Sequence, residues 1–184
     1  MQNLKYPKGA VLWFTGLSGA GKTTLAQSVS SELILRRYNP YILDGDELRR
    51  GLSADLGFTE DDRIEHNRRV AEVAKLMAGA GVIVIVALIS PYRRDRSRAR
   101  NIITEGGHPF FEIFVNTPLA ICESRDVKGH YKRARANQIT DFTGIHSPYE
   151  EPLFPDLAVH PEKESITEST SLILKAIFPS LPPR

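Results

Sequence analysis

Residues 16–24 read GLSGAGKTT, and the expected architecture follows from this stretch. Gly16, Gly21, Lys22 and Thr23 fill the fixed positions of the phosphate-binding pattern G-x-x-x-x-G-K-[ST]. The glycines allow a tight turn whose N–H groups point inward at phosphate oxygens. The lysine supplies a cation for the β- and γ-phosphates, and the threonine hydroxyl is suited to bind Mg²⁺. The stretch therefore predicts a site for a nucleoside triphosphate.

The segments on either side of this loop agree with that prediction. Residues 10–14 form an apolar run of strand length, and residues 24–37 carry apolar side chains at helical spacing. Strand, loop and helix thus occur in the order that the motif requires. A glycine-rich turn without function is the competing interpretation, and this order disfavours it.

Length and composition describe an ordinary globular protein. The 184 residues fit one domain, 1–184, with 41% hydrophobic and 25% charged residues. A net charge of +2 suits small anions and is too weak to indicate a nucleic-acid partner. The single cysteine, Cys122, cannot form an internal disulfide, and the longest apolar run, 82–89, is too short to span a bilayer. We expect a cytoplasmic protein with no membrane contact.

Predicted strands and helices alternate along the rest of the chain. The expected strands are 41–43, 82–88, 110–115 and 157–159, and the expected helices are 46–51, 61–80, 93–104, 118–125 and 165–177. This alternation predicts an α/β fold of the P-loop type, with an open, mainly parallel sheet and helices on both faces. Residues 179–184 should form a frayed tail. Residues 126–155 lack periodicity and carry several cations, which is typical of a mobile lid that closes over phosphates.

Acidic side chains follow the second predicted strand. Asp44 and Asp46 lie just past residues 41–43, at the sheet edge where open α/β sheets bind ligands. Either carboxylate can accept a hydrogen bond from an acceptor hydroxyl and help to hold Mg²⁺. The alternative is a simple turn in which Asp46 caps the next helix. We expect a catalytic role for this pair.

Polar residues also occur on the inward face of the predicted helix 61–80. Arg63, His66 and Asn67 continue the apolar stripe that begins at Val70. An inward cation is costly unless an anion meets it, although a solvated first turn that overhangs the core is an alternative. The helix 93–104 carries arginines at 93, 94, 96, 98 and 100. We expect most of these arginines to face water and one or two to face the ligand.

These parts together predict phosphoryl transfer to a bound small molecule. A switch GTPase is less consistent with the chain, because D-x-x-G occurs at 141–144 but no N-K-x-D guanine reader is present. A nucleic-acid-dependent ATPase would need an acid at the end of a core strand, whereas the strand after residue 82 ends at Ser90.

Six blocks in this order resemble the adenylyl-sulfate kinase family over nearly the whole chain. They read GLSGAGKTT (16–24), LDGDELR (43–49), GLSADLGFTEDDR (51–63), IVALISPYRRDR (85–96), CESRDVKGHYKRAR (122–135) and DFTGIHSPYEEP (141–152). The resemblance implies transfer of the γ-phosphate of ATP to the 3′-hydroxyl of adenosine 5′-phosphosulfate, in a homodimer. Another small-molecule or nucleotide kinase is the alternative.

The resemblance also assigns residues to roles. It implies that ATP is bound by Gly16, Leu17, Ser18, Gly19, Ala20, Gly21, Lys22, Thr23, Thr24 and Arg125. It implies that the acceptor is bound by Arg49, Phe58, Arg63, His66, Ile89, Ser90, Lys132 and Phe142, with the two phenylalanines around its adenine. The implied catalytic residues are Asp46, Asp44, Lys22 and Ser90, and Thr23 and Asp44 are the implied Mg²⁺ ligands.

Three positions need comment. Ser90 occupies the family's phosphoserine position, and we expect it to contact substrate without forming an obligatory intermediate, since in-line transfer needs no relay. His66 replaces an asparagine of the family pattern, and His146 stands where the family often has an acid. Because imidazole can be charged near an anion, we expect the acceptor affinity to depend on pH near neutrality.

Overall fold

The computed structural model describes residues 9–181 and contains a five-stranded sheet in the order β2-β3-β1-β4-β5. The strands are β1 (Ala10–Thr15), β2 (Pro40–Asp44), β3 (Ile83–Ala87), β4 (Phe110–Val115) and β5 (Leu157–Val159), and every neighbouring pair is parallel. Parallel neighbours need a crossover between them, which the intervening helices provide. The predicted α/β fold with a parallel sheet is confirmed.

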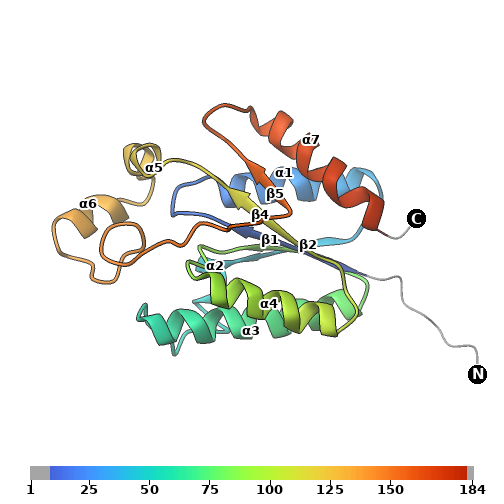
Figure 1. Ribbon diagram of the computed structural model, residues 1–184, viewed down its shortest axis with the longest axis horizontal. Coiled ribbons are helices and arrows are strands. Elements are labelled where there is room, and N and C mark those ends of the chain that lie inside the picture. The colour runs from blue at the N-terminus through green and yellow to red at the C-terminus, as the bar shows by residue number, and fades with distance from the viewer. Residues whose placement is uncertain (1–8, 182–184) are drawn as a thin grey trace, which may run out of the picture.

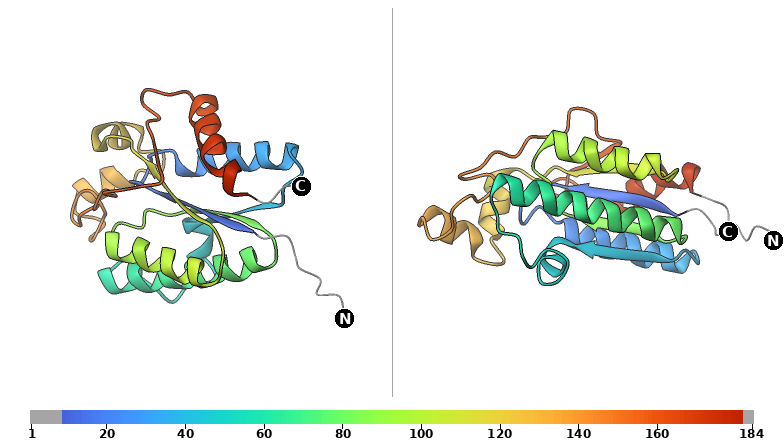
Figure 2. Two further views of the ribbon diagram at one scale, coloured as in Figure 1. Left: turned by 45° about the vertical axis from the view of Figure 1, so that its right-hand side comes forward. Right: turned by 90° about the horizontal axis from the view of Figure 1, so that it is seen from below.

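Two pairs of helices cover the two faces of the sheet (Figure 1). On one face lie α1 (Lys22–Leu35) and α7 (Ile166–Ile177), and on the other lie α3 (Glu60–Gly79) and α4 (Arg93–Glu105). The turned views in Figure 2 keep the same three layers. With helices on both faces, the central strands β1 and β3 are buried throughout, whereas the edge strand β2 exposes Tyr41.

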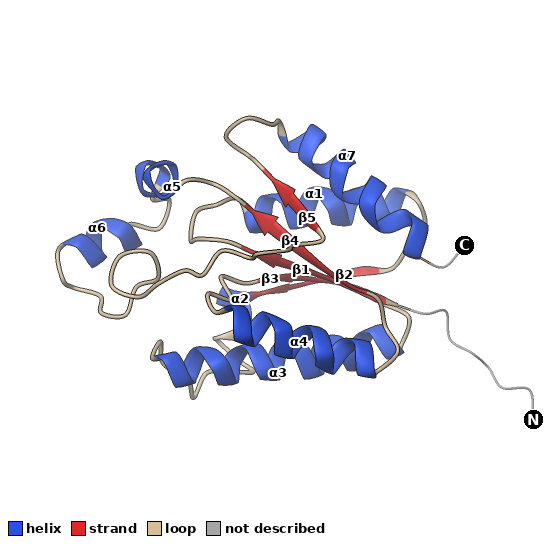
Figure 3. Cartoon of the chain, viewed as in Figure 1, coloured by secondary structure: helices blue, strands red, loops and turns tan. Residues whose placement is uncertain are grey.

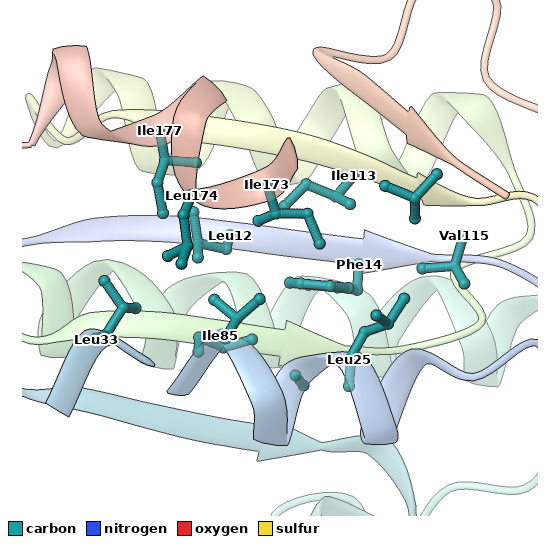
Figure 4. Close-up of a cluster of buried hydrophobic side chains, with 14 of the residues drawn as sticks. Leu12, Phe14, Leu25, Leu33, Ile85, Ile113, Val115, Ile173, Leu174 and Ile177 are labelled. Atoms are coloured by element: carbon teal, nitrogen blue, oxygen red, sulfur yellow. The ribbon is translucent and has the colours of Figure 1, made fainter. Parts of the chain in front are cut away.

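Strand β1 shows how the core is divided between the two faces. Leu12 and Phe14 point toward α1 and α7, in the cluster drawn in Figure 4, whereas Val11 and Trp13 belong to the cluster under α3 and α4. All four side chains are fully buried. Successive side chains of β1 therefore point into two different hydrophobic cores, one on each face of the sheet. This explains why the strand is a continuous apolar run in the sequence.

The short helices gather beyond the carboxyl ends of the strands (Figure 3). They are α2 (Gly45–Leu48), α5 (Leu119–Arg125) and α6 (His130–Arg135), and a 3₁₀ turn, Phe178–Ser180, follows α7. In the part of the chain from residue 9 to residue 181, no helix is long and apolar enough to cross a membrane.

Two local expectations need correction. The helix expected at 46–51 ends at Leu48. The segment 126–155, whose sequence shows no periodicity, contains α6 and buries Tyr131 and Thr143. The expectation of a frayed tail is wrong up to Leu181, which is buried against the α1 and α7 core, while residues 182–184 lie outside the described part of the chain.

Candidate active site

The loop between β1 and α1 has the backbone that its glycines predict. Gly16 has φ 153° and Gly19 has φ 74°, positive values that residues other than glycine rarely adopt. A Cβ at Gly16 would lie 2.6 Å from the carbonyl oxygen of Val115, and one at Gly19 would lie 3.2 Å from that of Cys122. The backbone of the loop therefore packs against the backbone at the end of β4 and in α5, and only glycine leaves enough space.

Lys22 lies inside this loop. Its side chain is buried, and its Nζ donates to the carbonyl oxygens of Gly16 at 2.9 Å and Leu17 at 2.7 Å. Burial lowers the pKa of Lys22 from 10.5 to about 8, against the opposing effects of Cys122 and Asp44. Phosphate oxygens would offer the ammonium stronger, charged partners than these two carbonyls.

Asp44 connects the loop to the next strand end. Its Oδ2 accepts a hydrogen bond from the Thr23 hydroxyl at 2.8 Å, and its Oδ1 accepts one from the backbone N–H of Asp46 at 2.9 Å. Asp44 is therefore the N-cap of α2, so the alternative in which Asp46 is the cap is wrong. The carboxylate of Asp46 instead pairs with Lys128, which lies between α5 and α6.

A cavity of about 590 Å³ joins the loop to α2, the end of β3 and the start of α3. Predicted residues that line it are Ser18, Gly19, Gly21, Lys22, Thr23, Thr24, Asp44, Asp46, Arg49, Phe58, Arg63, His66, Ile89, Ser90, Arg125 and Phe142. Four predicted residues, Gly16, Leu17, Ala20 and Lys132, do not line it. Leu17 lines a separate cavity, and Ala20 is fully buried.

Lys132 stays outside the cavity because of where α6 begins. Gly129, with φ 66°, precedes the helix, and the cavity is lined by His130, Tyr131 and Arg133 but not by the exposed Lys132. Lys128 is the lysine of this segment that reaches the cavity, where it pairs with Asp46. The sequence indicated that cations of segment 126–155, Lys128 among them, could close over phosphates. It did not show which of them reaches the cavity, because no pattern marks the start of α6.

Arg49, Arg63 and Phe58 form one wall of the cavity. The guanidinium carbons of Arg49 and Arg63 lie 4.5 Å and 5.6 Å from the centroid of the Phe58 ring. Arg63 is buried and donates to the carbonyl oxygens of Phe58 at 2.9 Å and Asp141 at 2.6 Å, so it ties the two sides of the cavity together. Phe58 is 56% exposed, which argues against an ordinary core position.

Phe142 has a different environment. It is partly buried, packs against the main core, and its ring centroid lies 5.0 Å from that of Tyr131 in an edge-on arrangement. It still lines the cavity. The position of this ring is thus fixed by packing, whereas that of Phe58 is set by the two arginines.

His66 is 4% exposed, and its Nδ1 lies 2.9 Å from the Ser53 hydroxyl. Burial, reinforced by Arg49, Arg69 and Arg63, lowers the pKa of His66 from 6.5 to about 4. The imidazole of the free protein is therefore neutral near pH 7, not charged. The expected dependence of acceptor affinity on pH near neutrality stays a prediction. The neighbouring Asn67, which also lines the cavity, was predicted to face inward but not to belong to the site.

Ser90 is 2% exposed and has an unusual φ of 40°. Its hydroxyl oxygen accepts a hydrogen bond from the Trp13 indole at 3.1 Å, and its carbonyl oxygen accepts one from Arg96 at 2.7 Å. Buried Arg96 also donates to Glu112 at 2.6 Å and to the carbonyl oxygen of Glu150 at 2.7 Å. No arginine of α4 lines the cavity, so the expectation that one or two face the ligand is wrong.

The parallel sheet, the loop around Lys22 and the cavity beyond the strand ends define a protein of the P-loop kinase class. The model of the family described as adenylylsulphate kinase matches residues 8–160. The chain belongs to this family.

Similarity to known adenylyl-sulfate kinases extends over nearly the whole length of this chain. The chain is 49% identical to a probable adenylyl-sulfate kinase of Bacillus subtilis, over 96% of this chain and 87% of the relative. It is 50% identical to an adenylyl-sulfate kinase of Vibrio cholerae, over 95% and 80% of the two chains. The fold matches that of the Mycobacterium tuberculosis APS kinase CysC in complex with AMPPNP and APS, with a TM-score of 0.91, 47% identity and coverage of 93% and 98%.

Proposed function

We propose that this protein is an adenylyl-sulfate kinase, which transfers the γ-phosphate of ATP to the 3′-hydroxyl of adenosine 5′-phosphosulfate and releases ADP and 3′-phosphoadenylyl sulfate. The observation that carries the proposal is that one cavity holds both the phosphate-binding loop and the wall of Arg49, Arg63 and Phe58. The relative from Mycobacterium tuberculosis was solved with an ATP analogue and adenylyl sulfate, which supports the same pair of ligands here.

ATP binds at the loop. Its phosphates lie against the inward N–H groups of residues 16–23 and the positive end of α1, and Lys22 neutralises charge on the β- and γ-phosphates. Arg125 lines the cavity on this side, where its Nη1 lies 3.5 Å from the carbonyl oxygen of Gly19.

The acceptor binds on the other side of the cavity. Arg49 and Arg63 hold the phosphosulfate, which gives the buried guanidinium of Arg63 the anion it lacks, and Phe58 and Phe142 stack on the adenine. Asp46 then accepts the hydrogen bond of the 3′-hydroxyl, orients it for in-line attack and takes up its proton as the new O–P bond forms and ADP leaves. Asp44 holds the start of α2.

Thr23 and Asp44 fit a magnesium site. Their hydroxyl and carboxylate are hard oxygen donors 2.8 Å apart, and Mg²⁺ is usually held by one or two carboxylates together with substrate phosphates. When bound, the ion would neutralise charge on the β- and γ-phosphates. A homodimer and a cytoplasmic location are further expectations, and light scattering on the purified protein would test the first of them.

Ser90 takes no phosphoryl group in this mechanism. Its buried hydroxyl accepts the indole N–H of Trp13, which supports a role in shaping the acceptor side of the cavity. Transfer in one in-line step needs no covalent relay. An acid-stable phosphoserine that forms and decays at the catalytic rate would contradict this assignment.

The deciding experiment supplies ATP, Mg²⁺ and adenylyl sulfate and follows 3′-phosphoadenylyl sulfate by liquid chromatography. We expect rapid product formation by the native protein and none above background by the Lys22→Ala variant. AMP and shikimate, tested as acceptors, address the alternative of another small-molecule kinase. Faster phosphorylation of either one, or no stimulation of ATP consumption by adenylyl sulfate, would reject the proposal.

A further inference from the structure

Two neighbouring residues on α3 keep polar side-chain atoms buried without a hydrogen bond. Within residues 9–181, Nε2 of His66 and Nδ2 of Asn67 have no partner, although the side chains are only 4% and 3% exposed. Buried polar groups are paired in the great majority of cases, and an unpaired one lowers stability. Two such atoms on adjacent residues of one helix therefore need an explanation.

The position of these atoms supplies it. Both residues line the cavity that also contains Arg49 and Arg63. One and two helical turns further along the same inward face, α3 carries Val70, Ala71 and Ala74, so the interior accepts apolar side chains there. Polar side chains at 66 and 67 occur only where the helix reaches the cavity.

The chemistry of the Asn67 side-chain amide limits which group can be its hydrogen-bond partner. Nδ2 of asparagine can only donate, so its missing partner is an acceptor atom. Arg49 and Arg63 make this side of the cavity positive, and they contribute to the low pKa of His66. An anionic oxygen fits both conditions, and a hydrogen bond to a charged acceptor is stronger than one to a neutral group.

We propose that Asn67 is a further substrate-binding residue, whose side-chain amide donates a hydrogen bond to an anionic oxygen of the acceptor nucleotide beside His66. This inference rests on the proposed function and adds to it. The two arginines supply the charge that attracts the acceptor, while the neutral pair at 66 and 67 supplies directional donors in the helix turn behind them.

The test is the Asn67→Leu variant, which keeps a similar volume and removes the donor. Calorimetric titration with adenylyl sulfate alone should show a Kd about 10- to 100-fold weaker than that of the native protein, the range for a lost hydrogen bond to a charged group. Titration with a non-hydrolysable ATP analogue should give an unchanged Kd. The unfolding temperature of the free variant should stay the same or rise, because an unpaired buried donor has been removed.

Matched variants complete the design. Asn101→Leu makes the same change at an exposed position of α4 outside the cavity and should leave both Kd values unchanged. Asn67→Asp places an acceptor at the site and should bind adenylyl sulfate more weakly than the leucine variant.

Two results would overturn the inference and leave the proposed function standing. The first is native affinity of Asn67→Leu for adenylyl sulfate, and the second is a clear fall in its unfolding temperature, which would show that Asn67 bonds within the protein. Failure of the native protein itself to bind adenylyl sulfate would instead reject the proposed function, and this inference with it.

Discussion

Asp44 and Asp46 are two residues apart, yet their surroundings differ. Asp44 uses both oxygens within the protein, toward Thr23 and the start of α2, whereas Asp46 pairs only with the exposed Lys128 among the described side chains. Ion pairs between exposed side chains are weak, so Asp46 can exchange this partner for a substrate hydroxyl.

We therefore predict that Asp46→Asn lowers kcat by about 100- to 10,000-fold, the usual contribution of a general base, with little change in the KM for ATP. Steady-state kinetics with adenylyl sulfate as acceptor would measure both quantities. Asp61→Asn, at an exposed acid of α3 outside the cavity, is the control. Equal loss in both variants would mean that Asp46 acts only through the overall charge.

His66 should make folding stability depend on pH. Its pKa is about 4 in the folded protein and 6.5 in an unfolded chain, so the unfolded state binds the extra proton between these values. The stabilising effect is complete above pH 6.5 and is lost as the pH falls toward 4. Between pH 7.5 and 5 the native protein should lose about 2 kcal/mol more than His66→Asn, as measured by urea unfolding. Parallel losses in the two proteins would contradict the buried, neutral imidazole.

At the residue scale, the sequence predicted most of the cavity. Motif spacing placed Lys22 and Thr23, and the end of the expected strand 41–43 placed Asp44. Helical periodicity turned Arg63 and His66 inward, as the structure has them. Helical periodicity predicts which way a side chain points but not whether it is protonated. The neutral state of His66 follows from its burial and from neighbouring arginines, and only the folded chain defines these.

At the scale of elements, the first turn of α3 carries Arg63 and follows Phe58. This turn is held by a capping box, in which the Thr59 hydroxyl accepts from the N–H of Asp62 and the Asp62 carboxylate accepts from the N–H of Thr59. Helix α7 has an equivalent box at Ser165, away from the cavity. The two boxes allow a matched comparison.

Thr59→Ala and Ser165→Ala should each cost about 1 kcal/mol of stability, the usual effect of losing an N-cap side chain. Only Thr59→Ala should also raise the KM for adenylyl sulfate, because fraying of this turn disturbs Arg63 and Phe58. Urea unfolding and steady-state kinetics give the two readouts. A raised KM in both variants would show that general destabilisation is the cause.

The segment 126–155 should divide into a mobile and a fixed part. Residues 136–141 make turns and are mostly exposed, whereas the backbone of Glu150 donates to Pro91 at 2.8 Å and accepts from buried Arg96 at 2.7 Å. We expect amide hydrogens of residues 136–141 to exchange fast in the free protein and more slowly with both nucleotides bound. Exchange around residue 150 should be slow in both states, and fast exchange there would contradict the anchoring role of Arg96.

At the scale of the whole molecule, the sheet was predictable and the internal structure of segment 126–155 was not. All five strands appeared within two residues of their expected bounds, because each strand is a short run rich in apolar residues. Helix α6 has no such pattern, and its place depends on a distant contact, the hydrogen bond from the Tyr131 hydroxyl to the carbonyl oxygen of Ser18 at 2.9 Å. The family resemblance alone implied Lys132, and the position of α6 leaves this lysine outside the cavity.

The cavity is built from segments that follow β1, β2, β3 and β4, so a ligand in it contacts loops held by most of the sheet. Binding should therefore stabilise the cooperative unfolding unit as a whole. A ligand at about 100 times its Kd adds about 2.7 kcal/mol, which for a chain of this size raises Tm by about 5–11 °C.

We predict such a rise with a non-hydrolysable ATP analogue and, separately, with adenylyl sulfate, in differential scanning fluorimetry. Lys22→Met should lose most of the response to the ATP analogue and keep the response to adenylyl sulfate, because the two ligands use different walls of the cavity. Loss of both responses in that variant would show that the loop and the acceptor wall do not bind independently, and that the acceptor nucleotide depends on Lys22 for its own affinity.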